Sequence, residues 1–150
     1  PMRSSAASDV YKRQIMYHEK WHSTTQKNRK KYTYNTNDHL IQQIFKRLQI
    51  QSGVFVEFGA WDGIHLSNTK LLFDKGWSGV LIEPNSDRFV DLKNNYLNTS
   101  VSVDNSFLNL SDCLFDDVYE RHFDKEIDFC SIDIDGLDLE IFETFERNMP

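Results

Sequence analysis

From residue 38 onward, short continuous runs of hydrophobic residues alternate with stretches in which apolar positions repeat at helical spacing. The runs at 54–58, 79–83, 100–103 and 128–134 are typical of strands buried on both faces, as in a parallel sheet. This alternation predicts a Rossmann-like α/β fold, a three-layer sandwich with a mainly parallel sheet and right-handed crossovers. The fourth run is too apolar for a comfortable exposed edge, so we expect a fold that is incomplete at its C-terminus.

Helices are predicted between and around these strands. The clearest covers 38–49, a short one covers 67–76, and Asn85 or Ser86 begins the next. A further helix is expected over 111–121, and a last one follows the fourth strand. The side chains expected to face inward from these helices are Leu40, Ile41, Ile44, Phe45, Leu48, Leu71, Leu72, Phe73, Phe89, Val90, Leu92, Leu114, Phe115, Val118, Leu139, Ile141, Phe142 and Phe145.

The chain before residue 37 differs in character from the rest. Residues 9–14, Asp-Val-Tyr-Lys-Arg-Gln, look like the in-frame translation of an adapter used in sequencing libraries. We therefore interpret residues 1–14 as a non-native segment. Residues 15–36 are polar, with aromatic residues at no clear period, and are interpreted as an N-terminal arm. Residues 37–150 are then expected to form a partial cofactor-binding domain.

Charge is distributed unevenly along the chain. The net charge is −6, made up of +7 over residues 1–50 and −13 over residues 51–150. An acidic domain does not attract nucleic-acid phosphates, so nucleic acid is not expected as a partner. No apolar run approaches the ~20 residues of a membrane helix, and no signal peptide is recognisable, so a cytoplasmic location without membrane contact is expected. The two cysteines, Cys113 and Cys130, lack the spacing of a metal site, and Cys130 is expected in the core.

Carboxylates stand at the ends of three predicted strands. Glu57 with Asp62 marks the first, Glu83 the second, and Asp133 with Asp135 the fourth. Parallel strands point the same way, so these groups are expected to converge at one edge of the sheet, where ligands bind in open α/β folds. Glu83 follows the first glycine turn by about twenty residues, the place at which doubly wound folds put an acid that accepts hydrogen bonds from ribose hydroxyls.

The first turn contains Gly59 and Gly63, which permit a sharp bend and a close approach of the backbone to a ligand. Its pattern is not that of a dinucleotide site, because Gly-x-Gly-x-x-Gly would require a glycine near Trp61. The turn also lacks the lysine of a phosphate-binding loop. These features argue against an NAD-type oxidoreductase, which remains an alternative, as does a non-catalytic binding module.

Three segments together carry a family resemblance. They are Val-Glu-Phe-Gly-Ala-Trp-Asp-Gly-Ile-His-Leu-Ser-Asn-Thr at 56–69, Gly-Val-Leu-Ile-Glu-Pro-Asn at 79–85 and Asp-Phe-Cys-Ser-Ile-Asp-Ile-Asp-Gly at 128–136. In this order and spacing they resemble class I S-adenosylmethionine-dependent methyltransferases, specifically the FkbM-like group, over roughly residues 53–148. The resemblance implies S-adenosyl-L-methionine as the cofactor and methyl transfer, most simply to an oxygen of a small-molecule or glycan acceptor.

The resemblance also implies roles for individual residues. The positions implied to surround the cofactor are Glu57, Gly59, Ala60, Asp62, Gly63, Glu83, Pro84, Asn105, Ser106 and Asp133. An acceptor hydroxyl would also need a base, for which Asp135, Asp133 and His65 are the candidates, in that order of preference. A sulfonium cation without phosphate suits an acidic pocket.

Plainer interpretations of the same residues remain open. Glu57 and Glu83 would each be satisfied by a nearby Lys or Arg. Asp133 and Asp135 have the spacing of Mg²⁺ ligands, although an Asp-Gly turn with ligand contacts is favoured and no metal site is predicted. Trp61 either walls the cofactor pocket or covers the end of the sheet.

Overall fold

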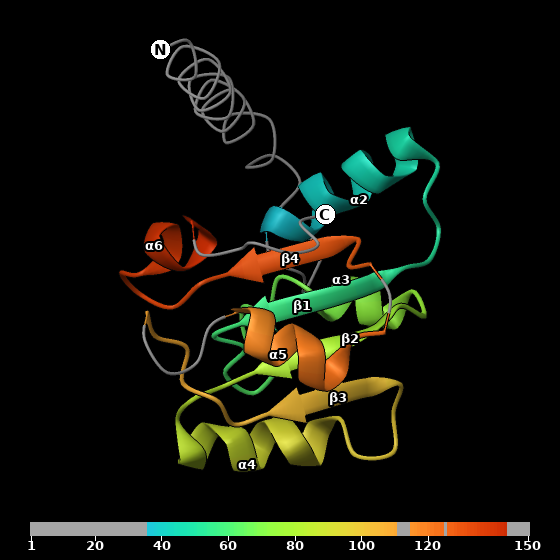
Figure 1. The fold of residues 1–150 in the computed structure, drawn as a ribbon. Helices are drawn as coiled ribbons and strands as arrows, with labels where there is room; N and C mark the ends of the chain where they lie inside the picture. The colour runs from blue at the N-terminus through green and yellow to red at the C-terminus, as the bar shows by residue number, and fades with distance from the viewer. Residues whose placement is uncertain (1–35, 111–114, 125, 144–150) are drawn as a thin grey trace, which may run out of the picture. The chain divides into compact units, whose positions relative to one another are not determined.

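A computed structural model describes residues 36–110, 115–124 and 126–143. Within these ranges, parallel strands β1 (Val54–Phe58), β2 (Ser78–Ile82), β3 (Val101–Asp104) and β4 (Phe129–Ile132) form a sheet in the order β3-β2-β1-β4. The strands point the same way in Figure 1, with their arrow tips on the left. The chain adds β2 and then β3 on one side of β1, and it then crosses over to add β4 on the other side of β1.

Helices cover both faces of this sheet. They are α2 (Thr36–Leu48), α3 (Lys70–Asp74), α4 (Ser86–Asn95), α5 (Phe115–His122) and α6 (Asp138–Glu143). One core cluster joins residues of α2, α3 and α4 to alternate strand residues that include Phe55 and Leu81. The other joins α5 and α6 to the intervening residues, which include Val56 and Val80. Successive residues of β1 and β2 therefore point to opposite faces of the sheet and contribute to two separate cores. The expected three-layer sandwich is confirmed.

The strands match the sequence-based expectation closely, with one exception. Every residue of β1 is buried, as expected of a central parallel strand. The fourth strand is shorter than the expected run 128–134, since Asp133 and Ile134 lie beyond its end. Asp133 continues the hydrogen bonding by donating its N–H to the carbonyl of Phe58 at 3.1 Å, and the backbone then leaves the sheet.

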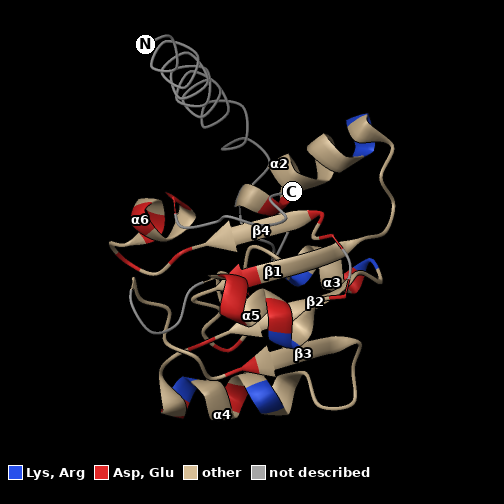
Figure 2. Cartoon of the chain, viewed as in Figure 1, with Lys and Arg blue, Asp and Glu red and all other residues tan. Residues whose placement is uncertain are grey.

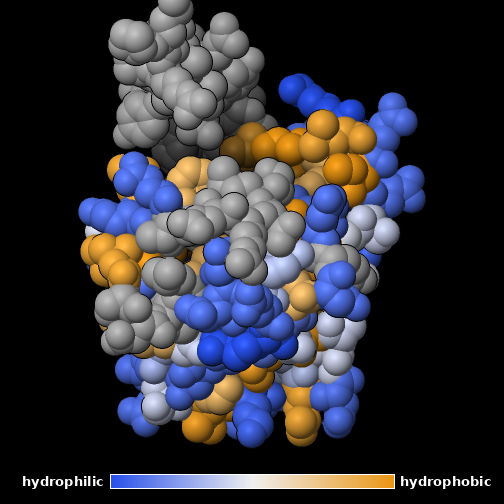
Figure 3. Space-filling model, viewed as in Figure 1, coloured by the Kyte–Doolittle hydropathy of each residue, from blue (hydrophilic) through white to orange (hydrophobic). Residues whose placement is uncertain are grey.

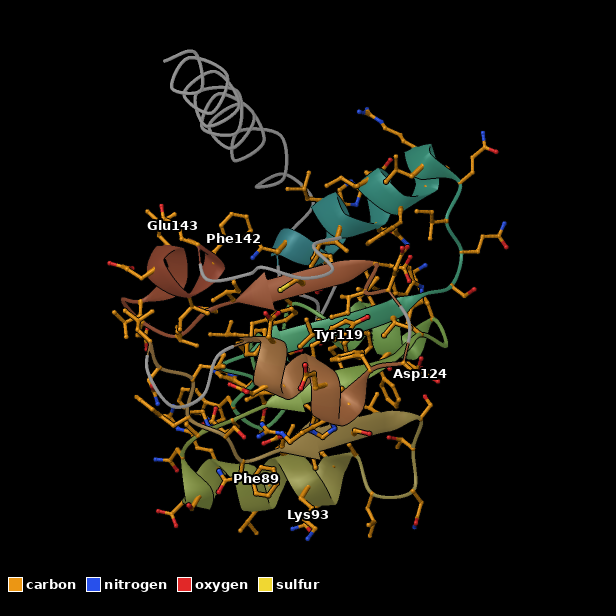
Figure 4. All side chains as sticks on the ribbon, viewed as in Figure 1. Phe89, Lys93, Tyr119, Asp124, Phe142 and Glu143 are labelled. Atoms are coloured by element: carbon orange, nitrogen blue, oxygen red, sulfur yellow. The ribbon has the colours of Figure 1, made fainter. Side chains whose placement is uncertain are left out.

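The helices bury fewer side chains than the spacing predicted. Among the hydrophobic side chains of α2 only Ile41 and Phe45 are buried, whereas Leu48 is 60% exposed. Figure 3 shows hydrophobic atoms along the surface of α2 accordingly. A single line of residues meets the core, because α2 contacts the sheet along one narrow stripe. The other side chains that were expected to face inward but are exposed are Leu40, Ile44, Val90, Leu139 and Phe142, the last labelled in Figure 4.

Helix boundaries follow the capping residues in the sequence, with one correction. Asn85 caps α4, because its side-chain oxygen accepts hydrogen bonds from the N–H groups of Asp87 and Arg88. Gly76, with a φ of +86°, follows the end of α3. Ser67 was expected to cap that helix; the N-cap position is Thr69, but Oγ of Ser67 accepts from the N–H of Thr69 at 3.2 Å and from the N–H of Lys70, the first residue of α3, at 3.1 Å.

Some predictions fall outside the described residues. They are the segment 1–14, nearly all of the arm at 15–36, and the side chains of Leu114 and Phe145. Within the described part of the chain, no helix is long and apolar enough to span a bilayer.

Candidate functional site

A cavity of about 350 Å³ opens at the edge of the sheet where the strands end. Four carboxylates line it, contributed by Glu57, Glu83, Asp133 and Asp135. Figure 2 shows acidic residues at the tips of the strands. The expectation that these groups converge is therefore met. The volume lies within the range of small-molecule sites.

Glu57 is 2% exposed and is held by the loop that leads into α3. Its Oε2 accepts hydrogen bonds from the hydroxyls of Ser67 at 2.7 Å and Thr69 at 2.6 Å, and its Oε1 accepts from the N–H of Asn68 at 2.7 Å. Burial raises the pKa of Glu57 above its ordinary value, and these three hydrogen bonds oppose the rise. The carboxylate is thus satisfied by hydroxyl and amide donors, not by the Lys or Arg that the plainer interpretation supposed.

The side chain of Glu83 forms hydrogen bonds with both the loop that follows β1 and the loop that follows β2. Its Oε2 accepts from the N–H of Trp61 and its Oε1 from the N–H of Asn85, both at 2.8 Å. The side chain is buried at the end of β2, yet it borders the cavity. A carboxylate has about four acceptor positions, so two remain for hydroxyl donors of a ligand.

Gly59 is required by a contact within the chain itself. Its φ is +80°, and a Cβ built on it would lie 1.9 Å from the carbonyl oxygen of Asp133. The N–H groups of Gly59 and Ala60 both donate to the carbonyl of Ile82 at 3.0 Å. The backbone after β1 therefore passes close to the end of β4 on one side and is bonded to β2 on the other.

Asp62 and Gly63 shape the loop at a place that does not line the cavity. Oδ1 of Asp62 accepts from the N–H of Ile64 at 2.9 Å and of His65 at 2.6 Å. The carbonyl of Gly63 accepts from the hydroxyl of Tyr96 at 2.6 Å, and a Cβ there would lie 2.3 Å from the tyrosine ring. These contacts fix the conformation of the loop that carries Trp61 and His65.

The two acids after β4 lie in a turn. Both are exposed, and Asp135 has a φ of +57° before Gly136. Asp138 organises this turn by accepting from the N–H groups of Ile134 and Gly136, and these bonds lower the pKa of its carboxyl group. No group of three potential metal ligands occurs within residues 36–110, 115–124 and 126–143.

The loop after β3 forms another wall of the cavity and is held in place from two sides. Nδ2 of Asn105 donates to the carbonyls of Glu83 at 2.7 Å and Pro84 at 3.2 Å, while Ser106 and Pro84 line the cavity. Asp104 accepts a hydrogen bond from Ser106 and lies 2.5 Å from Nε2 of His122 on α5.

Asp104 also forms an ion pair with α5. The guanidinium of Arg121 lies 3.3 Å from its carboxylate. Partial burial would raise the pKa of Asp104, but the hydrogen bonds from Ser106 and His122 and the nearby charge of Arg121 outweigh burial, so its pKa is lowered. Asp104 therefore anchors this wall of the cavity as a charged group.

Arg88, which the sequence did not single out, completes the lining together with Trp61 and His65, so Trp61 does border the cavity. The guanidinium of Arg88 lies 3.8 Å from the centre of the Trp61 ring, and the ring of His65 meets the same indole edge-on at 5.7 Å. All three line the cavity. Arg88 is separated from Trp61 by 27 residues, and only the pairing of β1 with β2 brings them together.

The cavity combines these polar groups with apolar walls. Phe107, Leu108 and Leu137 line it, so it offers both flat hydrophobic surface and acceptor oxygens. Among the described lining residues there is no lysine, and Arg88 is the one Lys or Arg side chain. The described lining fits a ligand that has an apolar, hydroxyl-bearing body and a positive charge.

Comparisons with known proteins identify the fold. A putative caffeoyl-CoA O-methyltransferase from Staphylococcus aureus is similar over 97% of this chain and 68% of its own, with a TM-score of 0.51 and 16% identity. The glycopeptide N-methyltransferase MtfA, solved with sinefungin, is similar over 68% of this chain and 38% of its own, with a TM-score of 0.42 and 14% identity. Neither a scan against protein-family models nor a search of curated proteins finds a match. The chain therefore shares the Rossmann-like α/β fold of a solved structure described as a methyltransferase.

Proposed function

We propose that the chain is part of an S-adenosylmethionine-dependent methyltransferase whose cofactor occupies the carboxylate cavity. The observation that carries the proposal is the convergence of Glu57, Glu83, Asp133 and Asp135 on a single cavity. The three sequence motifs and the fold support it. A sulfonium nucleoside has the positive charge and the ribose hydroxyls that such a lining accepts.

Each wall of the cavity has a role in this proposal. Glu83 would accept hydrogen bonds from the ribose hydroxyls with the acceptor positions that Trp61 and Asn85 leave open. The loop of Asn105 and Ser106, with the neighbouring apolar side chains, would border the adenine. Gly59, Ala60, Glu57 of β1 and the acids that follow β4 would surround the methionine end.

The proposed transfer is to an oxygen atom. The cofactor supplies an electrophilic methyl group on a positively charged sulfur. The chain must hold the acceptor oxygen in line with that methyl group, about 3 Å away, and remove the hydroxyl proton as the oxygen–carbon bond forms and the carbon–sulfur bond breaks. Asp135, Asp133 and His65 are the candidate bases, and each lines the cavity. Membership of the FkbM-like group and a small-molecule or glycan acceptor belong to the same proposal.

Isothermal titration calorimetry with S-adenosylhomocysteine and with NADH tests the cofactor assignment. We expect saturable binding of S-adenosylhomocysteine and none of NADH. The reverse result would replace the proposal with an oxidoreductase.

Substitution of Glu83 tests its assignment to the ribose. Glu83→Ala is expected to weaken S-adenosylhomocysteine binding by about 1–3 kcal/mol, the magnitude of a lost charged hydrogen bond. Asp91→Ala, which removes an exposed carboxylate from α4, is the matched control and should leave the affinity unchanged. Circular dichroism of both variants establishes that they are folded, because Glu83 also holds two backbone N–H groups. Unaltered affinity in a folded Glu83→Ala variant contradicts the ribose assignment.

A further inference from the structure

A second cavity lies at the opposite edge of the sheet. Its volume is about 610 Å³, and it is lined by α2, α3 and the residues that precede β1 and β2. Gln51 lies shortly before β1 and Trp77 immediately before β2, so this cavity is at the edge where the strands begin, on the right of Figure 1. The two cavities share no lining residue.

The floor of this second cavity is apolar. Phe45, Leu72 and Trp77 line it and are buried in the core beneath it. The rings of Phe45 and Trp77 meet edge-on, with 4.6 Å between their centres. Nε1 of Trp77 donates to the carbonyl of Gln51 at 3.2 Å, so the one polar atom of the indole is already hydrogen-bonded. Such a floor favours contact with an apolar group.

The rim of the second cavity is cationic. Lys46 from the last turn of α2 and Lys75 from the end of α3 both line it, and none of the described lining residues is an Asp or Glu. Neither lysine has a carboxylate within ion-pair distance in the described part of the chain, and the neighbouring Asp74 is paired with Lys70.

We propose that this cavity binds a small amphipathic anion, with an aliphatic body on the floor and a carboxylate head at Lys46 and Lys75. Two like charges beside one cavity repel each other, and an anion between them converts that repulsion into attraction. Long lysine side chains can cover an apolar body with their methylene groups while their ammonium groups reach its head. The proposal does not depend on the function of the carboxylate cavity.

Calorimetric titration of the whole chain with octanoate, below its micelle concentration, tests the proposal. Neutral 1-octanol is the comparison ligand, because it has the same body without the charge. We expect octanoate to bind at least tenfold more tightly than 1-octanol. In the double variant Lys46→Gln/Lys75→Gln, the two ligands are expected to bind equally weakly.

Lys93→Gln provides the control, since Lys93 is exposed on α4, away from α2 and α3 in Figure 4. It should retain the preference of the wild type for octanoate. The single variants Lys46→Gln and Lys75→Gln should each lose part of that preference. The proposal is overturned if octanoate binds the double variant as tightly as the wild type, if 1-octanol binds the wild type as tightly as octanoate, or if octanoate does not bind.

Discussion

Substitution of Gly59 by alanine would place a methyl group where the end of β4 already lies. The added Cβ would lie 1.9 Å from the carbonyl oxygen and 2.9 Å from the carbonyl carbon of Asp133. Both atoms belong to the backbone, and Asp133 is held in position by its N–H bond to Phe58. No side-chain rotation can relieve this clash, so β1 and β4 must separate at their ends.

The cost has two parts. Alanine at a φ of +80° loses ~1–2 kcal/mol for the left-handed conformation. Forcing a methyl group into an occupied site costs ~1–3 kcal/mol more. We therefore expect Gly59→Ala to lower the free energy of unfolding by about 2–5 kcal/mol, a large share of the stability of an ordinary domain.

Gly76 offers a matched control for the first part alone. Its φ is +86°, and a Cβ there would meet nothing within 4 Å. Gly76→Ala should therefore cost only ~1–2 kcal/mol. Urea unfolding followed by circular dichroism gives both values, provided that the slope with denaturant is unchanged. Equal losses in the two variants would refute the argument that Gly59 is required by the close approach of Asp133.

Other predictions concern titratable groups. Glu57→Gln should lower the free energy of unfolding by ~1–3 kcal/mol in urea at pH 7. The side-chain amide nitrogen of glutamine would face a hydroxyl or N–H group that now donates a hydrogen bond to the carboxylate. Burial raises the pKa of Glu57 from 4.5, so the folded state binds its proton more tightly than the unfolded chain, and the stability contribution of Glu57 should fall as pH rises above 4.5. The pKa of Asp104 is lowered from 3.8, so its contribution to the stability of the fold should be present above pH 3.8 and lost at lower pH. Asp104→Asn should therefore reduce the loss of stability in acid. An identical acid profile in this variant would contradict the pairing with His122 and Arg121. Burial raises the pKa of Cys130 to about 12, so in a Cys113→Ser variant the remaining thiol should react slowly with iodoacetamide at pH 8, and a rate typical of an exposed thiol would contradict its burial.

The strands and the convergence of the carboxylates could be predicted from the sequence. A short run of β-branched and aromatic residues such as Val54–Phe58, followed by a glycine, favours a strand buried on both faces, and parallel strands end at the same edge. From this it followed that Glu57, Glu83 and Asp133 would approach one another, and all three line one cavity.

The partners of these groups could not be predicted. Glu57 bonds to hydroxyls and an amide in the loop at 67–69, and nothing in the spacing distinguishes that loop from an arginine as its partner. The contact between Arg88 and Trp61 depends on how the loop after β1 is bent, with Trp61 itself at a φ of +53°. Non-local contacts of this kind are set by the assembled sheet.

Helical spacing predicted more buried side chains than the structure has, for a related reason. An apolar residue at the right period can face the sheet or face solvent, and the decision depends on how the helix lies on the sheet. Ile41 and Phe45 meet the sheet, whereas Leu40, Ile44 and Leu48 remain exposed.

The carboxylate of Glu83 has a consequence for how the cavity opens. One side chain is bonded to Trp61 in the loop after β1 and to Asn85 at the start of α4. If either loop swings outward alone, it leaves a negative oxygen without a donor in a buried place, at a cost of ~1–3 kcal/mol or more. The loop after β1 and the start of α4 are therefore coupled through Glu83. A ligand that enters between them is expected to displace both segments together.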